Sequence, residues 1–283
     1  MAARRPPHNG RVTIRVRRPL ILLVAVAVVV AVGGAAAGAA WWRWDTGRQP
    51  TVRDAVAAMD RAVADAVVAA GPGAAVALSG VVRSTGCRIN FLHSGGAFTA
   101  NADLYTDAGT EDSLIGGIAQ RLSGAYTVTR GPAVAGIRPL LADLAGGVQL
   151  AVRSLGGGWL QVSARTGCSL GTQAPQVTPS DAGAATAGIT ALFGRLGTRP
   201  ASFSEHRLDC RSGAIVTVAA VSEPVDSAGL SERLAAAVPA GVQPFTAGRS
   251  NRLAYRDGDV SVIVAASDDG TAVTSQYTTT CAR

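Results

Sequence analysis

Residues 117–122 read GIAQRL and residues 229–234 read GLSERL, and this pair of stretches indicates how the chain is organised. Both lie in segments expected to be helical, at about 112–123 and 226–238. The offset of 112 residues continues downstream, where Leu141-Ala142 corresponds to Leu253-Ala254 and Gly146 to Gly258. We therefore interpret the chain as two copies of one unit.

The correspondence extends to further strands and to the cysteines. Val148, Leu150 and Val152 match Val260, Val262 and Val264. One extra residue near Thr271 aligns Cys168 with Cys281, and a length difference of 11 residues upstream aligns Cys87 with Cys210. The ordered agreement of helix, strands and cysteines favours duplication over chance.

Each copy shows the same alternation of elements. A helix is expected first, at 52–70 in copy one, where apolar residues recur every three or four positions, and at about 182–196 in copy two, opened by Ser180. Strands follow at 75–83 and 97–106, and at 201–208 and 214–222. After the second helix, glycine-rich turns separate two or three more strands, the clearest turn being Asp257-Gly258.

These elements predict an α+β fold in which an N-terminal transmembrane helix precedes two tandem α-β-β-α-β-β-β units with mostly antiparallel sheets and one disulfide each. The expected segments are a cytoplasmic basic tail (1–19), the transmembrane helix (20–40), a juxtamembrane spacer (41–51), repeat unit 1 (52–168), a linker (169–179) and repeat unit 2 (180–283). Whether the units pair side by side or stay separate is left open by the sequence.

The membrane segment is predicted from its length and its flanks. No charged residue occurs in the 21 positions from Leu20 to Ala40, which as a helix would span about 32 Å, enough for a bilayer core. Arginines including Arg17 and Arg18 precede it, and Trp41, Trp42 and Trp44 follow it. We expect a cytoplasmic N-terminus and an extracytoplasmic remainder. A cleaved signal peptide is the alternative, because residues 37–39 (AGA) fit a cleavage site.

The net charge of +7 belongs to the N-terminal tail. Six of the 26 basic residues, all arginine, precede the apolar run, and the other 20 face 19 acidic residues beyond it. Because the outer part is nearly neutral, its composition gives no support for nucleic-acid binding.

The four cysteines all follow the membrane segment, where an oxidising compartment favours disulfides. Three pairings are open in principle, and the repeat selects Cys87 with Cys168 and Cys210 with Cys281. A metal site would need clustered ligands such as C-x-x-C, which the sequence lacks, so we expect no metal and no cofactor.

Catalytic candidates are few. Residues 167–171 (GCSLG) match the G-x-S-x-G pattern of serine hydrolases, but a linker rather than a helix is expected after Ser169. His93, in an insertion of copy one, and His206, in a strand, are weak candidate site residues. The acidic groups at 107–112, 257–259 and 268–269 fit helix ends and turns.

We therefore expect a single-pass membrane-anchored extracytoplasmic binding or interaction protein of the bacterial cell envelope, without catalysis. Its partner would be an envelope protein, a cell-wall component or a small ligand held between the units. An envelope hydrolase whose acids or histidines meet only in the fold, and the outer part of a sensor or secretion complex, are the alternatives. The plan resembles that of single-anchor extracytoplasmic proteins of high-GC Gram-positive bacteria, a likeness that implies no activity.

Overall fold

A computed structural model describes residues 51–89, 93–171, 183–210, 213–226, 228–245 and 251–281. Residues 50–283 form one compact unit. The expected tail, membrane segment and flanking residues (Arg17, Arg18, Trp41, Trp42, Trp44) lie outside the described residues, as do Ser180 and most of the expected linker. Among the helices that the structure describes, none combines the length and the apolar character needed to cross a membrane.

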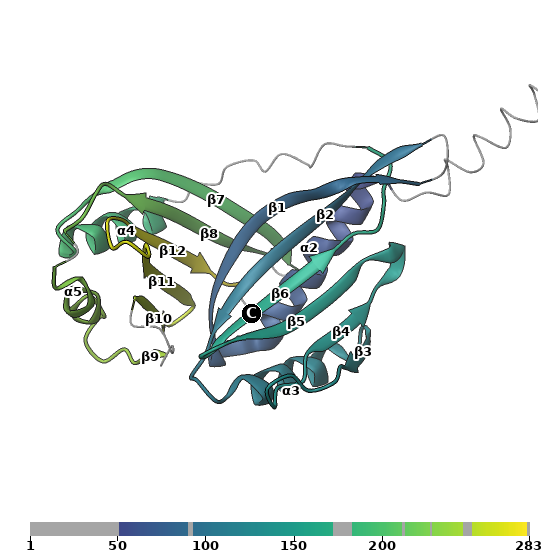
Figure 1. Ribbon diagram of the computed structural model, residues 1–283, viewed down its shortest axis with the longest axis horizontal. Coiled ribbons are helices and arrows are strands. Elements are labelled where there is room, and N and C mark those ends of the chain that lie inside the picture. Colours follow the sequence, from purple (N-terminus) through teal and green to yellow (C-terminus); the bar gives the residue numbers. More distant parts are fainter. Residues whose placement is uncertain are drawn as a thin grey trace, which may run out of the picture. The chain divides into compact units, whose positions relative to one another are not determined.

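The first half of the unit contains helices α2 (Val52–Ala70) and α3 (Glu111–Leu122) and one antiparallel sheet (Figure 1). Its six strands lie in the order β1-β2-β6-β5-β4-β3. Their bounds are β1 Ala75–Arg88, β2 Ser94–Tyr105, β3 Thr127–Arg130, β4 Leu140–Asp143, β5 Gln149–Gly156 and β6 Trp159–Arg165. Short 3-10 turns occupy Gly71–Gly73 and Ala145–Gly147.

The second half repeats this plan with helices α4 (Gly183–Arg195) and α5 (Leu230–Ala236). Its six strands lie in the corresponding order, β7-β8-β12-β11-β10-β9, and are again antiparallel. Their bounds are β7 Pro200–Cys210, β8 Gly213–Ser222, β9 Pro244–Phe245, β10 Arg252–Asp257, β11 Val260–Ala266 and β12 Val273–Thr279. The fold is therefore α+β with two antiparallel sheets, as the sequence predicted.

Each half has one strand more than the expected α-β-β-α-β-β-β order. Strands β3 and β9, which follow the second helix of each half, are the additional ones, with four and two residues. Such short segments carry too little apolar alternation to be recognised in a sequence.

Helix α2 has the bounds that the apolar spacing predicted. The Thr51 hydroxyl oxygen accepts a hydrogen bond from the Asp54 backbone N–H at 3.2 Å, which is a typical N-cap. Its buried side chains pack on one face of the first sheet, together with residues such as Phe98, Leu104 and Leu160. Burying each large apolar side chain contributes about 1.5–3 kcal/mol, so this layer supplies much of the driving force for folding.

The second sheet has a core of its own beneath α4. Ile189, Leu192 and Phe193 of the helix are buried with Val218 and Val264 of the sheet. In each sheet, alternate residues face the helix, and the other set forms a helix-free face.

The helix-free face of the second sheet packs against the first half of the unit at strand β1. Ala75 and Ala77 of β1 contact Ala254 and Ile263 in a small buried cluster. The Leu78 backbone N–H donates to the Thr217 hydroxyl at 2.9 Å, so this N–H of edge strand β1 is satisfied by the other sheet. The two copies therefore share an interface rather than standing apart as separate beads.

The gapless offset of 112 residues is wrong at one strand. In the first sheet Leu140 pairs with Val152, and in the second Leu253, not Arg252, pairs with Val264. Strand β10 is therefore displaced by one residue relative to β4. This displacement keeps Leu253 on the helix side and turns Arg252 to the helix-free face, since neighbouring side chains point to opposite faces of a strand.

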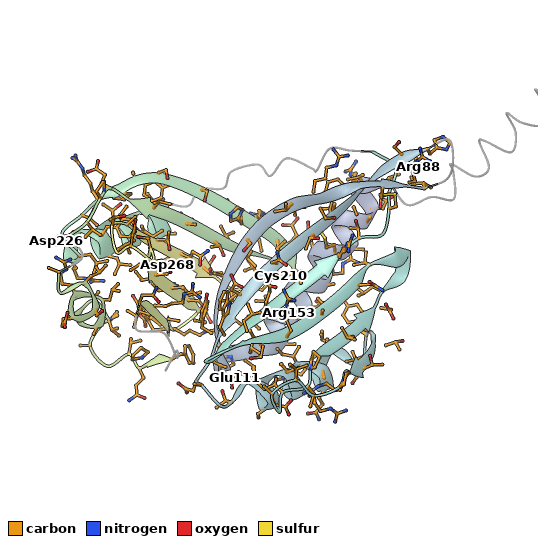
Figure 2. The ribbon with its side chains drawn as sticks, viewed as in Figure 1. Arg88, Glu111, Arg153, Cys210, Asp226 and Asp268 are labelled. Carbon is orange, nitrogen blue, oxygen red and sulfur yellow. A yellow bond between two sulfur atoms is a disulfide. The ribbon has the colours of Figure 1, made fainter. Side chains whose placement is uncertain are left out.

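The four cysteines form the disulfides Cys87–Cys168 and Cys210–Cys281, the pairing that the repeat predicted. Their Cα–Cα distances of 5.8 and 6.5 Å lie in the usual range. Cys87 and Cys210 lie inside strands β1 and β7 rather than after them; Cys210 is labelled in Figure 2. Each disulfide thus joins an edge strand to the end of its own half.

Candidate functional site

A cavity of about 280 Å³ lies between the helix-free faces of the two sheets. The first sheet contributes side chains from β2 and β6, and the second from β7, β8, β10, β11 and β12. The lining residues are Asp103, Tyr105, Trp159, Ser202, Ser204, Ala219, Ala220, Val221, Arg252, Ile263, Ala265, Thr274 and Gln276. No other cavity described below draws charged groups from both sheets.

Arg252 is the positive group of this cavity. Its guanidinium carbon lies 4.6 Å from the ring centre of Trp159 and 5.3 Å from that of Tyr105, a cation–π arrangement with both rings. Its Nη1 donates to the Tyr105 hydroxyl at 2.9 Å, whereas its buried Nε has no hydrogen-bond partner. A buried donor without an acceptor costs about 1–3 kcal/mol, so the guanidinium has unused capacity for an incoming acceptor.

Asp103 is the negative group. One carboxylate oxygen accepts a hydrogen bond from Trp159 Nε1 at 3.0 Å. Burial raises the pKa of Asp103, and the Trp159 hydrogen bond and the charge of Arg252 oppose that rise. Asp103 and Arg252 influence each other electrostatically, yet no ion pair within 4.0 Å joins them in the described structure.

The register of the first sheet places these groups. Tyr105 and Trp159 are direct cross-strand partners of β2 and β6, and their rings stack with centres 6.1 Å apart. Asp103 lies two residues before Tyr105 and therefore points to the same face. The one-residue displacement of β10 brings Arg252 to the helix-free face opposite them.

A tight turn fixes the start of β6 just before Trp159. Gly158 has a φ of +78°, and a Cβ there would lie 2.1 Å from the Thr106 carbonyl oxygen, so only glycine fits. The Glu111 carboxylate at the start of α3, labelled in Figure 2, accepts hydrogen bonds from the Gly158 and Gly109 N–H groups. Burial raises the pKa of Glu111, but these hydrogen bonds outweigh burial and lower it overall.

Neither weak candidate histidine lies in this cavity. His206 is half-buried against Gly80 of β1, where an added Cβ would lie 2.8 Å from its ring. It faces a space of only about 20 Å³, and burial lowers its pKa while the charge of Glu205 opposes this. His93 lies just before β2, its backbone carbonyl accepting from Ile89, so the two histidines belong to different hairpins.

Ser169 is not placed as a hydrolase nucleophile. Its side chain is completely buried, and its hydroxyl donates to the Gly167 carbonyl at 3.3 Å. Its backbone pairs with Gly96 in an isolated bridge, and Leu170 pairs with Thr51. The first two residues of the expected linker are thus held against the first sheet.

The acidic groups singled out in the sequence are structural in their surroundings. Asp112 forms an ion pair with Arg130 and accepts from the Arg138 N–H at 2.8 Å. Asp257 and Asp269 lie at the hairpin turns of the second sheet, where the predicted Asp257-Gly258 turn joins β10 to β11. The described ranges contain no group of three His, Cys, Asp or Glu side chains placed to hold a metal ion.

Two further cavities, of about 410 and 510 Å³, flank the C-terminal end of α2. In them Arg121 donates to the Ala69 carbonyl, and Arg256 donates to the Gly71 carbonyl at 2.8 Å. These arginines satisfy carbonyl groups at the negative end of a helix, which explains them structurally. The cavity between the sheets is therefore the candidate site.

Its key residues escaped the sequence analysis. Trp159 is the one tryptophan outside the cluster at 41–44, and its isolation was the available signal. Asp103 and Arg252 lie about 150 residues apart in the sequence and meet only through the packing of the two sheets. Arg252 was also assigned to the wrong repeat position.

Comparison with known proteins gives no functional assignment. No family model matches the chain, and no curated protein sequence matches it. A solved structure described as "Crystal structure of MucB in complex with MucA(peri)" aligns with 76% of this chain and 91% of its own, at 10% sequence identity and a TM-score of 0.14. A similarity at that level establishes neither a shared fold nor a shared partner.

Proposed function

We propose that this chain is a single-pass membrane-anchored binding protein of the bacterial cell envelope, whose extracytoplasmic part holds a small ligand between its two sheets. The uncharged segment 20–40, with arginines before it and tryptophans after it, supports the anchor and its orientation. The two disulfides support an oxidising compartment.

The observation that carries the binding proposal is the composition of the cavity between the sheets. Specific small-molecule sites combine apolar walls with a few convergent polar groups that fix the orientation of the ligand. Here the walls include Ala219, Ile263 and Ala265, and the polar groups include Asp103 and Arg252. Duplication provided two surfaces, and the ligand would lie where they meet.

Reversible binding is favoured over hydrolysis by the position of the candidate nucleophile. A serine hydrolase needs an accessible serine within hydrogen-bond reach of a histidine that is oriented by an acid. Ser169 is completely buried, and the hydroxyls that line the cavity, Ser202 and Ser204, share it with no histidine.

The test compares small molecules carried by the full chain and by a variant with a blocked cavity. The full chain is purified in detergent from its own membranes, and the molecules released by denaturation are identified by mass spectrometry. Ala219 faces the cavity, so Ala219→Phe fills the space without changing a charge. Val82→Phe, at an exposed position of β1 away from the cavity, is the matched control.

The proposal expects a molecule that is enriched in the wild-type protein and the Val82→Phe control and depleted in Ala219→Phe. Equal amounts in all three preparations would remove the cavity as the binding site. Protease accessibility of the C-terminal part in intact cells tests the orientation separately, because a protected C-terminal part contradicts the proposed topology.

A further inference from the structure

The cavity between the sheets presents one positive and one negative group that do not pair with each other. Arg252 comes from the second sheet and Asp103 from the first, and both line the same space. No carboxylate among the described residues lies within 4.0 Å of Arg252. A partly buried guanidinium without a counter-ion favours an anionic ligand, and a planar carboxylate matches its geometry best.

Asp103 adds a second requirement to the ligand. One of its oxygens accepts from Trp159 Nε1, and a carboxylate has about four acceptor sites in all. A ligand that brought only a carboxylate would place a second negative charge beside Asp103. A ligand that also brings an N–H donor offsets that repulsion, and an ammonium group offsets it most strongly.

The dimensions and the remaining lining of the cavity restrict the size of the ligand. Its volume of about 280 Å³ lies at the lower limit of small-molecule sites, which hold about 300–1,000 Å³. Ala219 and Ala265 leave room for a short aliphatic group, and Ser202, Ser204 and Thr274 are exposed polar residues at its boundary.

We infer that the cavity binds a small zwitterion of the amino-acid or short-peptide class, with its carboxylate on Arg252 and its amino or amide N–H directed to Asp103. This inference rests on the proposed function, because it names the class of ligand for the same cavity. The separation of the two protein charges is matched by the separation of opposite charges within such a ligand.

The competing interpretation is that Arg252 only ties the two sheets together. Its contacts with Tyr105 and Trp159 across the interface would then be its whole role. In that case a zwitterion gains nothing from the site, and its binding does not depend on either charge. The two interpretations differ in binding measurements rather than in stability.

Trp159 provides the signal for the test. The full chain is prepared in detergent micelles with Trp41, Trp42 and Trp44 replaced by phenylalanine, which leaves Trp159 as the single tryptophan. Its emission is followed during titration with alanyl-alanine. Alanyl-alaninamide, which lacks the carboxylate, and N-acetyl-alanyl-alanine, which lacks the ammonium group, are titrated in parallel.

The inference expects a saturable change with alanyl-alanine and at least about tenfold weaker binding of the amide, because a charge-assisted contact is lost. The acetylated peptide should bind more weakly than alanyl-alanine but retain its dependence on Arg252. Unsaturable titrations, or equal affinity for the peptide and its amide, would overturn the assignment of a zwitterion.

Variants connect the binding to the two charges. Arg252→Gln should weaken alanyl-alanine binding at least about tenfold and abolish the preference for the peptide over the amide. Asp103→Asn should reduce the preference for a free ammonium group. Arg153→Gln is the matched control, because Arg153 is an exposed arginine on the helix-free face of β5 outside the cavity (Figure 2).

The outcomes separate this inference from the function it rests on. If Arg252→Gln fails to fold, Ala219→Phe still tests the site, because it fills the cavity and keeps both charges. A ligand that co-purifies in an Ala219-dependent manner, without any zwitterion binding, overturns the ligand class and leaves the binding function standing. Zwitterion binding that is unchanged in Ala219→Phe, Arg252→Gln and Asp103→Asn overturns the site itself.

Discussion

The guanidinium of Arg252, on strand β10 of the second sheet, lies 4.6 Å from the ring centre of Trp159, on strand β6 of the first. The two residues are 93 positions apart, and each belongs to a different copy of the duplicated unit. Their contact closes one side of the cavity, so it contributes to stability and to the site at once.

The energy of this contact is measurable by a double-mutant cycle. Arg252→Gln and Trp159→Leu, separately and together, should show a coupling of about 0.5–2 kcal/mol, because a partly buried cation–π contact is removed by either change. Denaturant unfolding of the full chain in micelles, followed by circular dichroism, gives the four free energies. Strictly additive effects would show that the contact contributes nothing.

Asp60 should make stability decrease with rising pH. Burial, and secondarily the charge of Asp209, raise its pKa to about 7 from 3.8. The folded state therefore favours the protonated acid. Below pH 4 the acid is protonated in both states; between about pH 4 and 7 only the unfolded state readily ionises, so stability falls by at most about 1.4 kcal/mol per pH unit.

Asp60→Asn should remove this component and raise the melting temperature more at pH 8 than at pH 5. The Asp60 Oδ1 atom has no hydrogen-bond partner, so little is lost on replacement. Asp268→Asn, at an exposed turn of the second sheet (Figure 2), is the control and should leave the pH profile unchanged. Parallel profiles for wild type and Asp60→Asn would contradict the expectation.

Glu111→Gln should lower stability and disturb the cavity. The carboxylate accepts from the Gly158 and Gly109 N–H groups, and a neutral amide would accept more weakly and place a donor beside them. We expect a loss of about 1–3 kcal/mol, seen in denaturant unfolding. A blue or red shift of Trp159 emission in the single-tryptophan protein would show that the turn positions Trp159; Glu232→Gln, on α5, is the control.

Removal of one disulfide should destabilise the chain strongly. Cys210 and Cys281 close a loop of 71 residues, so their joint replacement by alanine should cost very roughly 4 kcal/mol in the chain-entropy model. Reduction of the wild type should add four protons in mass, and cleavage mapping should recover both predicted pairs. Detection of Cys87 linked to Cys210 would refute the pairing.

Ser169 should be inert towards serine-directed reagents. Its hydroxyl is fully buried, so a fluorophosphonate probe should not label the folded chain at this residue. Ser169→Ala should leave ligand binding unchanged. Labelling that disappears in Ser169→Ala would instead support the hydrolase that the G-x-S-x-G pattern suggests.

The structure also explains why repeat-based reasoning succeeded for some elements and failed for others. The bounds of α2 and the two cysteine pairs followed from apolar spacing and from ordered matches, which are local or pairwise properties of the sequence. The position of β10 did not follow, because strand register depends on the neighbouring strand and on the turn between them. The loop between β4 and β5 is longer than the turn between β10 and β11, and this difference displaces one pairing by a residue.

The sequence by itself therefore determined that the chain carries two related α+β units with one disulfide each, since periodicity, turn residues and repeated cysteines are encoded locally. Only the tertiary structure decided where a ligand could bind. The helix-free face of the second sheet packs against β1 through small residues such as Ala75 and Ala77, and this contact leaves a space lined by Asp103, Trp159 and Arg252. Those residues have no relationship along the chain, because the packing of one sheet on another depends on surface complementarity between distant segments.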